Sequence, residues 1–329
     1  MSRTARTTRL KVHGHLPEGY LADALRRDAA FGLTSAPKWL PPKWFYDARG
    51  STLFEEITRL PEYYPTRAER EILERHAADV AATLPAHTLI ELGSGSSEKT
   101  RLLLDALRAA GTLERYVPVD VSEPALVEAA EALLREYPGL AVDAVVSDFD
   151  AELGIPDEPG PKLVAFLGGT LGNLNPDERA AFLAAVRAKL RTGDGLLLGA
   201  DLVKDPEVLV RAYDDAQGVT ADFNRNVLRV LNRELDGDFD VERFEHVALW
   251  NSEQEWIEMR LRSRGDQAVK LRDLDLAVEF ADGEELRTEI SAKFRVSGLT
   301  MELERAGFVV SRWWTDRENR FGVALAMPF

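Results

Sequence analysis

Between residues 69 and 201, stretches with apolar residues at helical spacing alternate with short runs that are almost wholly apolar. The helical spacing predicts helices over residues 69–84, 99–110, 125–136 and 176–190. The apolar runs predict strands over residues 88–92, 116–120, 140–146, 162–167 and 195–201. Strands that alternate with helices of this length are typical of a parallel, doubly wound α/β sheet. Pro118 lies inside the second strand, where it forfeits only one ladder hydrogen bond.

The pattern changes after residue 204. Residues 205–234 are predicted to form two helices, and period-two alternation over residues 257–261 and 274–280 predicts antiparallel strands covered on one face. A helix over residues 299–306 and a hairpin of strands over residues 308–314 and 322–327 then end the chain. We therefore expect one domain made of residues 68–204 and 295–329, with residues 205–294 inserted into it.

The first 67 residues have a third kind of composition. Seven aromatic residues, at positions 39, 44, 45, 46, 54, 63 and 64, are interleaved with prolines, which exclude one long helix. This segment could form an aromatic lid, or its rings could pack the domains together, which is the more ordinary interpretation for most of them. We expect residues 16–67 to join residues 205–294 in a second, α+β substrate-binding domain. Residues 1–15 carry four basic and no acidic side chains and are expected to form a flexible tail.

Composition excludes several classes of function. The net charge of −15 argues against broad nucleic-acid binding, and no apolar run reaches the roughly 18 residues that span a bilayer. The absence of cysteine excludes disulfides and thiolate sites and fits a cytoplasmic location. The five histidines are scattered without a metal-binding spacing, so no metal is expected. We expect a cytoplasmic monomer that acts on a small molecule, with no nucleic-acid or membrane partner.

The most informative segment is T-L-I-E-L-G-S-G-S-S-E-K-T, residues 88–100. A glycine turn between strand and helix lets a ligand approach bare backbone at the carboxyl edge of the sheet. Asp120 and the pair Asp148 and Phe149 follow the next two strands, where they could accept from ribose hydroxyls and an adenine edge and cover the adenine face. Glu98 stands where a dinucleotide-binding turn has its third glycine, and a phosphate would be repelled there. S-adenosylmethionine has no phosphate and fits this pattern, whereas a turn that binds no ligand is the alternative.

Several motifs resemble one family. L-P-P-K-W-F-Y-D, T-R-L-P-E-Y-Y-P-T-R, E-L-G-S-G-S-S-E-K-T-R, F-L-G-G-T-L-G-N-L and T-E-I-S-A-K-F run in order along nearly the whole chain. Together they resemble the histidine-specific N-alpha-methyltransferases of ergothioneine biosynthesis. The resemblance implies a class I (Rossmann-like) methyltransferase sheet with a terminal β-hairpin and a second, substrate-binding domain. It also implies conversion of L-histidine to hercynine by three methylations of the alpha-amine, with S-adenosyl-L-methionine as methyl donor.

The resemblance further implies a role for individual residues. The positions that hold S-adenosylmethionine correspond to Gly93, Lys99, Asp120, Asp148 and Phe149. The position nearest the reacting centre, taken as catalytic, is Tyr46. Those that hold the carboxylate and amine of histidine are Tyr63, Asn173 and Tyr213, and those that read the imidazole are Glu289 and Ser291.

The residue types suit these roles. Glu289 and Ser291 are two apart on a predicted strand over residues 288–294, so both side chains face the same side. A carboxylate and a hydroxyl can pair both nitrogens of an imidazole, and such a site rejects analogues that leave them unpaired. Without the resemblance, an exposed strand carboxylate is the more ordinary interpretation of Glu289. Asn173 could instead cap the helix that begins at Pro176, and Tyr213 could merely pack between the domains.

Methyl transfer to an amine needs little acid or base catalysis. A free alpha-amino group has a pKa of about 8, so a neutral fraction exists near pH 7 and Tyr46 could relay the departing proton. One rival function is an enzyme of the same architecture that acts on another amino acid, such as a tryptophan derivative. Glu289 argues against it, because an indole offers one donor and no acceptor. A rival of another class is a non-catalytic protein that binds S-adenosylmethionine.

Overall fold

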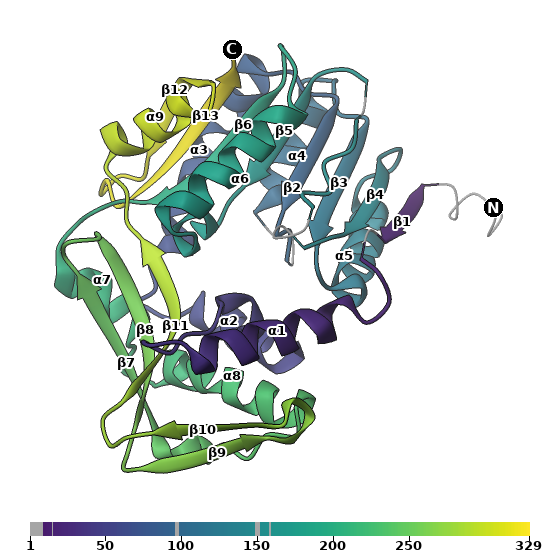
Figure 1. Ribbon diagram of the computed structural model, residues 1–329. Coiled ribbons are helices and arrows are strands. Elements are labelled where there is room, and N and C mark those ends of the chain that lie inside the picture. Colours follow the sequence, from purple (N-terminus) through teal and green to yellow (C-terminus); the bar gives the residue numbers. More distant parts are fainter. Residues whose placement is uncertain (1–8, 15, 96–98, 149–151, 158) are drawn as a thin grey trace.

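The larger part of the molecule is an eight-stranded sheet (Figure 1), seen in a computed structural model that describes residues 9–14, 16–95, 99–148, 152–157 and 159–329. The strand order is β1-β4-β3-β2-β5-β6-β13-β12. The strands are β1 (Leu10–Gly14), β2 (Thr88–Leu92), β3 (Arg115–Asp120), β4 (Ala141–Val146), β5 (Lys162–Phe166), β6 (Gly195–Asp201), β12 (Phe308–Thr315) and β13 (Phe321–Pro328). β13 runs antiparallel between β6 and β12, and the remaining pairs are parallel. The predicted doubly wound sheet with a terminal hairpin is confirmed.

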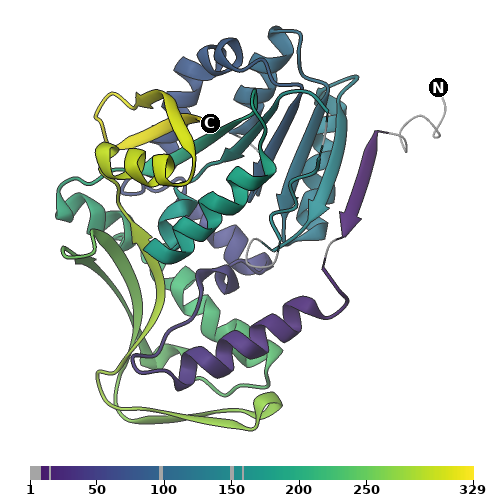
Figure 2. The same cartoon turned by 45° about the horizontal axis from the view of Figure 1, so that its top comes forward.

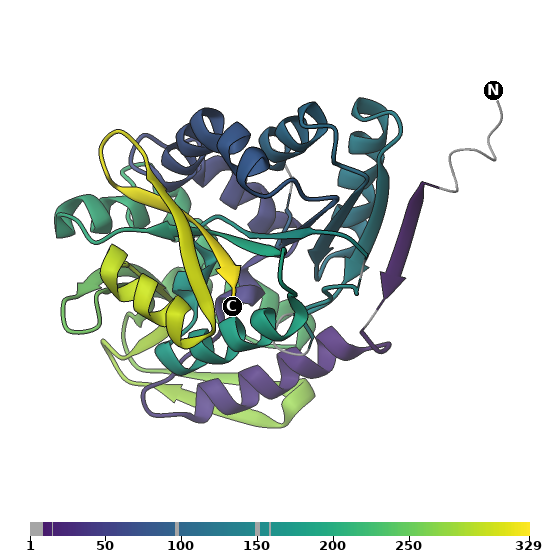
Figure 3. The same cartoon turned by 90° about the horizontal axis from the view of Figure 1, so that it is seen from above.

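Helices cover both faces of this sheet, as the view from above shows (Figure 3). One face packs against α3 (Pro65–Thr83), α4 (Thr100–Ala109) and α5 (Glu123–Glu136), and the other against α6 (Pro176–Lys189) and α9 (Val296–Arg305). Because both faces are covered, every residue of β2, β5 and β6 is buried. This burial explains why the strands are recognisable in the sequence as continuous apolar runs.

The edge strand β1 corrects one expectation. Residues 1–15 were expected to form a flexible tail, but Leu10–Gly14 pair in parallel with β4 along its whole length (Figure 2). Val12 is 40% exposed, and most of the strand faces solvent. β1 satisfies the backbone groups of β4 that would otherwise lie at an open edge. The remainder of the expected tail, residues 1–8 and 15, lies outside the described residues.

The second part of the molecule lies beneath the carboxyl ends of β2 to β6 (Figure 1). Its helices are α1 (Tyr20–Thr34), α2 (Ala48–Ile57), α7 (Pro206–Tyr213) and α8 (Val219–Glu234), with single turns η2 (Pro42–Phe45), η4 (Val241–Arg243) and η5 (Arg272–Leu274). β7 (Phe244–Asn251), β8 (Trp256–Ser263) and β11 (Glu285–Ala292) form one antiparallel sheet, and β9 (Gln267–Leu271) pairs with β10 (Leu276–Phe280). The turn η3 (Thr170–Asn173) follows β5 and packs on β11. None of the helices in the described ranges is long and apolar enough to cross a membrane.

The aromatic segment contributes to the core of this second part. The ring of Phe45 lies 4.6 Å from that of Phe223 on α8, and the ring of Phe54 lies 5.9 Å from it. Gly50 allows this close packing, because a Cβ atom there would lie 1.7 Å from the carbonyl oxygen of Phe45. Packing therefore accounts for Phe45 and Phe54, while Tyr46 and Tyr63 extend toward the site described next.

Candidate functional site

The glycine turn after β2 lies directly against the end of β3. Gly93 and Gly95 have φ angles of 71° and 47°, in the left-handed region that glycine adopts without strain. The N–H of Gly93 donates to Val119 O (2.8 Å), and the N–H of Gly95 donates to Asp120 Oδ2 (3.3 Å). Burial nevertheless raises the pKa of Asp120. The structure thus brings together Gly93 and Asp120, two of the residues predicted to bind the nucleoside.

Asp148, at the end of the next strand, is covered by the second part of the molecule. Its carboxylate is 4% exposed and accepts from Tyr20 Oη at 3.2 Å and from Lys43 Nζ at 3.4 Å. Lys43 also forms an ion pair with Asp28 (3.4 Å). Residues of α1 and η2 therefore reach the same edge of the sheet as the glycine turn. Phe149, the predicted adenine-covering residue, lies outside the described residues.

Lys99 connects the turn to the loop after β5. Its ammonium group forms an ion pair with the fully buried Glu69, which also accepts from the N–H of Gly168 at 2.8 Å. Nearby, Glu91 accepts 2.6 Å hydrogen bonds from Thr100, and burial raises the pKa of Glu91 to about 7. Lys99 and Thr100, where α4 begins, are thereby held by buried carboxylates.

Asn173 and Glu289 are direct partners. Asn173 Nδ2 donates to Glu289 Oε1 (3.0 Å) and to Ile290 O (2.8 Å). Asn173 does not cap the following helix, because Asn175 is the N-cap of α6 and forms a capping box there. Burial raises the pKa of Glu289 to about 7, against the opposing effects of the Asn173 hydrogen bond and the charge of Lys293. Glu289 is thus not an exposed strand carboxylate.

Tyr213 and Ser291 form a second pair beside the first. Their hydroxyl oxygens lie 2.7 Å apart, and the side chains are 8% and 6% exposed. The ring of Tyr63 stands 6.3 Å from that of Tyr213 in an edge-on arrangement. Tyr213 therefore does more than pack between the domains, since its hydroxyl belongs to a polar cluster at the end of α7.

Tyr46 lies between the two groups of predicted residues. Its ring packs edge-on against Phe54 and Phe223, yet 45% of the side chain is accessible to solvent. Burial raises the pKa of its hydroxyl well above the usual value, and the charges of Glu289 and Asp120 add to this effect. Tyr46 is thus half-exposed, and its hydroxyl senses the charges of both carboxylates.

A cluster of buried charges that was not predicted lies behind Tyr213. Lys293 Nζ lies 3.0 Å from Asp201 Oδ2, and Lys204 Nζ lies 2.6 Å from Asp201 Oδ1. Tyr64 donates to both oxygens of the same carboxylate at 2.9 and 2.8 Å. Burial lowers the pKa of Lys204 to about 8, and the two lysines hold the pKa of Asp201 below its usual value despite burial. Lys293 could have been found from the sequence, because it follows Glu289 and Ser291 at the same period of two.

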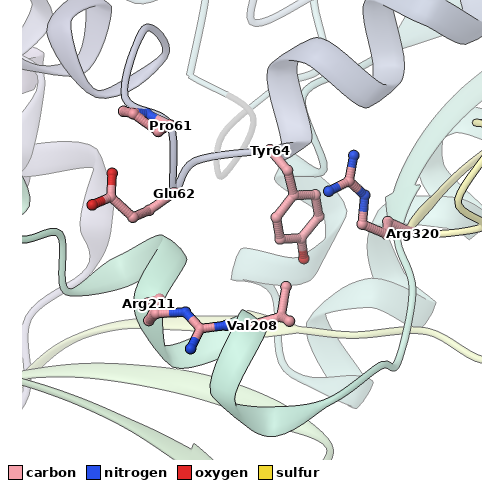
Figure 4. Close-up of a pocket in the computed structure, with 6 residues that line it drawn as sticks. All are labelled: Pro61, Glu62, Tyr64, Val208, Arg211 and Arg320. Atoms are coloured by element: carbon pink, nitrogen blue, oxygen red, sulfur yellow. The ribbon is translucent and has the colours of Figure 1, made fainter.

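A cavity of about 370 Å³ lies on the other side of Tyr64 (Figure 4). It is lined by Pro61, Glu62, Tyr64, Val208, Arg211 and Arg320. The guanidinium of Arg320 lies over the Tyr64 ring, 5.1 Å from its centroid. None of the predicted site residues that the structure describes lines this cavity. We therefore locate the functional site by its converging polar side chains rather than by this opening.

The sheet, the glycine turn with its strand-end carboxylates, and a polar cluster at the same edge of the sheet define a class I, S-adenosylmethionine-dependent methyltransferase. In the described residues, no three histidine or acidic side chains are grouped so as to hold a metal ion.

More specifically, the chain belongs to the family of histidine-specific, S-adenosylmethionine-dependent methyltransferases, which matches residues 25–328. It is 56% identical to the histidine N-alpha-methyltransferases of Mycolicibacterium smegmatis and Mycobacterium tuberculosis, over 97% of this chain and 99% of each relative. It is also 29% identical to an L-tryptophan methyltransferase of Psilocybe serbica, over 90% of this chain and 91% of that protein.

Proposed function

We propose that this protein transfers three methyl groups from S-adenosylmethionine to the alpha-amine of L-histidine, giving hercynine, an early step of ergothioneine biosynthesis. The observation that carries the proposal is the convergence of Asn173 with Glu289 and of Tyr213 with Ser291 in one polar cluster. The names of the two relatives with 56% identity support the same reaction.

The residues at the sheet edge fit the methyl donor. The donor supplies an electrophilic methyl group on a cationic sulfur, and it carries no phosphate. Asp120 would accept from the ribose hydroxyls and Asp148 from the adenine amine, while Gly93 leaves the backbone bare for close approach. Lys99 would attract the donor's carboxylate. The buried, acidic surroundings of the turn are compatible with a cationic ligand, whereas they would disfavour a pyrophosphate.

The polar cluster fits an amino acid with an imidazole. Tyr63 and Asn173 offer a hydroxyl and an amide group for the carboxylate and amine, and Tyr213 stands beside them with its hydroxyl bonded to Ser291. Glu289 and Ser291 offer a carboxylate and a hydroxyl for the two ring nitrogens. These groups are desolvated, so a side chain that left them unpaired would bind much less tightly. This requirement selects histidine over an amino acid with an apolar ring.

Tyr46 is suited to keep its proton and not to act as a base, because burial raises its pKa well above neutral pH. We infer that its hydroxyl orients the amine or relays the departing proton through water, and that its ring face contacts the growing ammonium. Tyr46→Phe should lower kcat about 10²- to 10⁴-fold while the Kd for histidine changes little, a range set by the usual contribution of a positioned proton-transfer group. Full activity in this variant would rule the role out.

The decisive experiment is an incubation with methyl-labelled S-adenosylmethionine and each of the twenty amino acids, read by mass spectrometry. Trimethylated histidine as the sole product supports the proposal. Methylated tryptophan would favour the rival substrate suggested by the Psilocybe relative. Binding of the methyl donor with no methylated product would indicate a non-catalytic protein.

A further inference from the structure

Lys293 lies at the centre of the polar cluster although it is not among the residues assigned to either ligand. Its side chain is 0% exposed, and its Nζ has three oxygen neighbours: Tyr213 Oη at 2.8 Å, Ser291 Oγ at 2.8 Å and Asp201 Oδ2 at 3.0 Å. An ammonium group has three donors and no acceptor. All three N–H bonds are therefore used, and both hydroxyl oxygens must accept from Lys293.

This arrangement fixes what the two hydroxyls can offer a ligand. Tyr213 and Ser291 share one hydrogen bond of 2.7 Å, which uses one of their two hydroxyl protons. Among the described residues, no acceptor lies within hydrogen-bond distance of the second proton. Both side chains are more than nine-tenths buried, and an unmade buried hydrogen bond costs about 1–3 kcal/mol. The pair is therefore prepared to donate one hydrogen bond to an acceptor on the ligand.

We infer that Lys293 is a specificity-determining positioning residue that makes the Tyr213–Ser291 pair a donor, so that the site takes the neutral imidazole of histidine. The bare ring nitrogen would face the hydroxyl pair, and the N–H nitrogen would face Glu289. An imidazolium ring carries N–H on both nitrogens, and one of them would then meet the donor. The inference deepens the proposed function and rests on it.

The surrounding charges act in the same direction. The ionisable groups that interact with Lys293 or with its hydroxyl partners are Asp201, Lys204, Glu289, Tyr46, Tyr63 and Tyr64. Asp201 is shared by two lysines, so the side of the site at Ser291 has two cations and one carboxylate. Glu289, two residues before Ser291 on the same side of β11, is the carboxylate that would contact the other ring nitrogen. An imidazolium would therefore be repelled by the cations near Ser291. A neutral ring avoids this repulsion, because its N–H donates to Glu289 and its bare nitrogen accepts from the hydroxyl pair.

The test compares histidine binding to the wild-type protein and to Lys293→Met between pH 5.5 and 8, by calorimetry with S-adenosylhomocysteine present. In the wild type, association should weaken at least tenfold per pH unit below the imidazole pKa of about 6.5, because only the neutral ring binds and protonation of Glu289 adds to the decline. In Lys293→Met this slope should be lost or much reduced, since Glu289 can then hold an imidazolium. Lys293→Arg should restore the slope, and Lys270→Met, at an exposed position of β9, should match the wild type. Equal slopes in the wild type and Lys293→Met overturn the inference.

A second measurement needs no variant and decides the matter if Lys293→Met does not fold. L-histidine labelled with ¹⁵N at both ring nitrogens is bound to the wild-type protein at pH 6, and its ring signals are recorded. One protonated and one bare nitrogen support the inference, and two protonated nitrogens overturn it. Failure of histidine to bind at every pH would overturn the proposed function together with this inference, and that result differs from binding with an unchanged slope.

Discussion

Replacing Glu289 by glutamine removes a charge from the site while keeping its shape. Glu289 accepts from Asn173 Nδ2 at 3.0 Å, and the carbonyl oxygen of a glutamine can accept the same hydrogen bond. The other carboxylate oxygen becomes an amide NH₂, which meets the imidazole N–H as a second donor. The fold should therefore be retained while the contact with the ring is lost.

The magnitude follows from the kind of bond that is removed. A hydrogen bond to a charged group contributes about 1.5–3 kcal/mol, which corresponds to roughly a 10- to 150-fold change in an equilibrium constant. We expect Glu289→Gln to raise KM for histidine by a factor in this range and to leave KM for S-adenosylmethionine unchanged. Initial rates with each substrate varied in turn measure the two constants separately. Glu279→Gln, at an exposed position of β10, is the matched control and should behave as the wild type.

The pH dependence of kcat/KM gives a second, independent test of the role of Glu289. The pKa of Glu289 is raised to about 7, so lowering the pH through 7 protonates the carboxylate and removes the acceptor for the ring N–H. In the wild type, kcat/KM for histidine should therefore fall from pH 8 to pH 6 more steeply than protonation of free histidine explains. Glu289→Gln should lose the extra decline. An unchanged KM together with an unchanged pH profile would refute the assignment of Glu289 to the imidazole.

Three further outcomes are expected. Asp120→Asn should weaken S-adenosylmethionine binding about tenfold or more in calorimetry, because the ribose loses a charged acceptor. The pKa of Glu91 is about 7 in the folded protein and near 4.5 in the unfolded chain. Glu91 therefore contributes fully to the free energy of unfolding below pH 4.5, and this contribution, about 3 kcal/mol, is lost as the pH rises to 7. Glu91→Gln should remove that component from urea unfolding measured at pH 5 and pH 8, and an identical pH dependence would contradict it. Gly50→Ala should lower the free energy of unfolding by about 1–3 kcal/mol, because its Cβ would overlap Phe45 O, and an unchanged urea midpoint would be inconsistent with this packing.

The main sheet could be predicted closely because its strands are buried on both faces. Each of its seven predicted strands matches the structure to within one residue at either end. The helix predicted from residue 69 begins earlier, at Pro65, because a proline at the first helical position starts a helix without breaking its periodicity. β1 was missed for the opposite reason. It is short, mostly exposed and paired only to β4, so its five residues carry no pattern of burial.

The second part of the molecule was predicted less completely. Leu274 was assigned to an alternating strand, but it lies in η5, and β10 begins only after Asp275, whose φ of 49° interrupts the extended backbone. β7, β9, α1 and α2 were not predicted. Their positions depend on packing against distant elements, as α2 packs on α8, and such contacts leave little local signal.

In the functional site, too, some residues share a local sequence pattern and others are brought together only by distant packing. Glu289, Ser291 and Lys293 share one side of β11 and its continuation, so a period of two is sufficient to associate them. Asp201 pairs with Lys293 directly, and Tyr64 acts through the same carboxylate. These two residues are 137 positions apart in sequence and meet only where the end of β6 lies against the start of α3. The residues proposed to contact the ligand are therefore accessible to sequence reasoning, whereas the charges proposed to fix their hydrogen-bonding direction are not. Because a hydroxyl can donate or accept, residue identity at position 291 alone does not determine which form of imidazole the site binds. That choice depends on a buried ion pair formed where the two parts of the molecule meet.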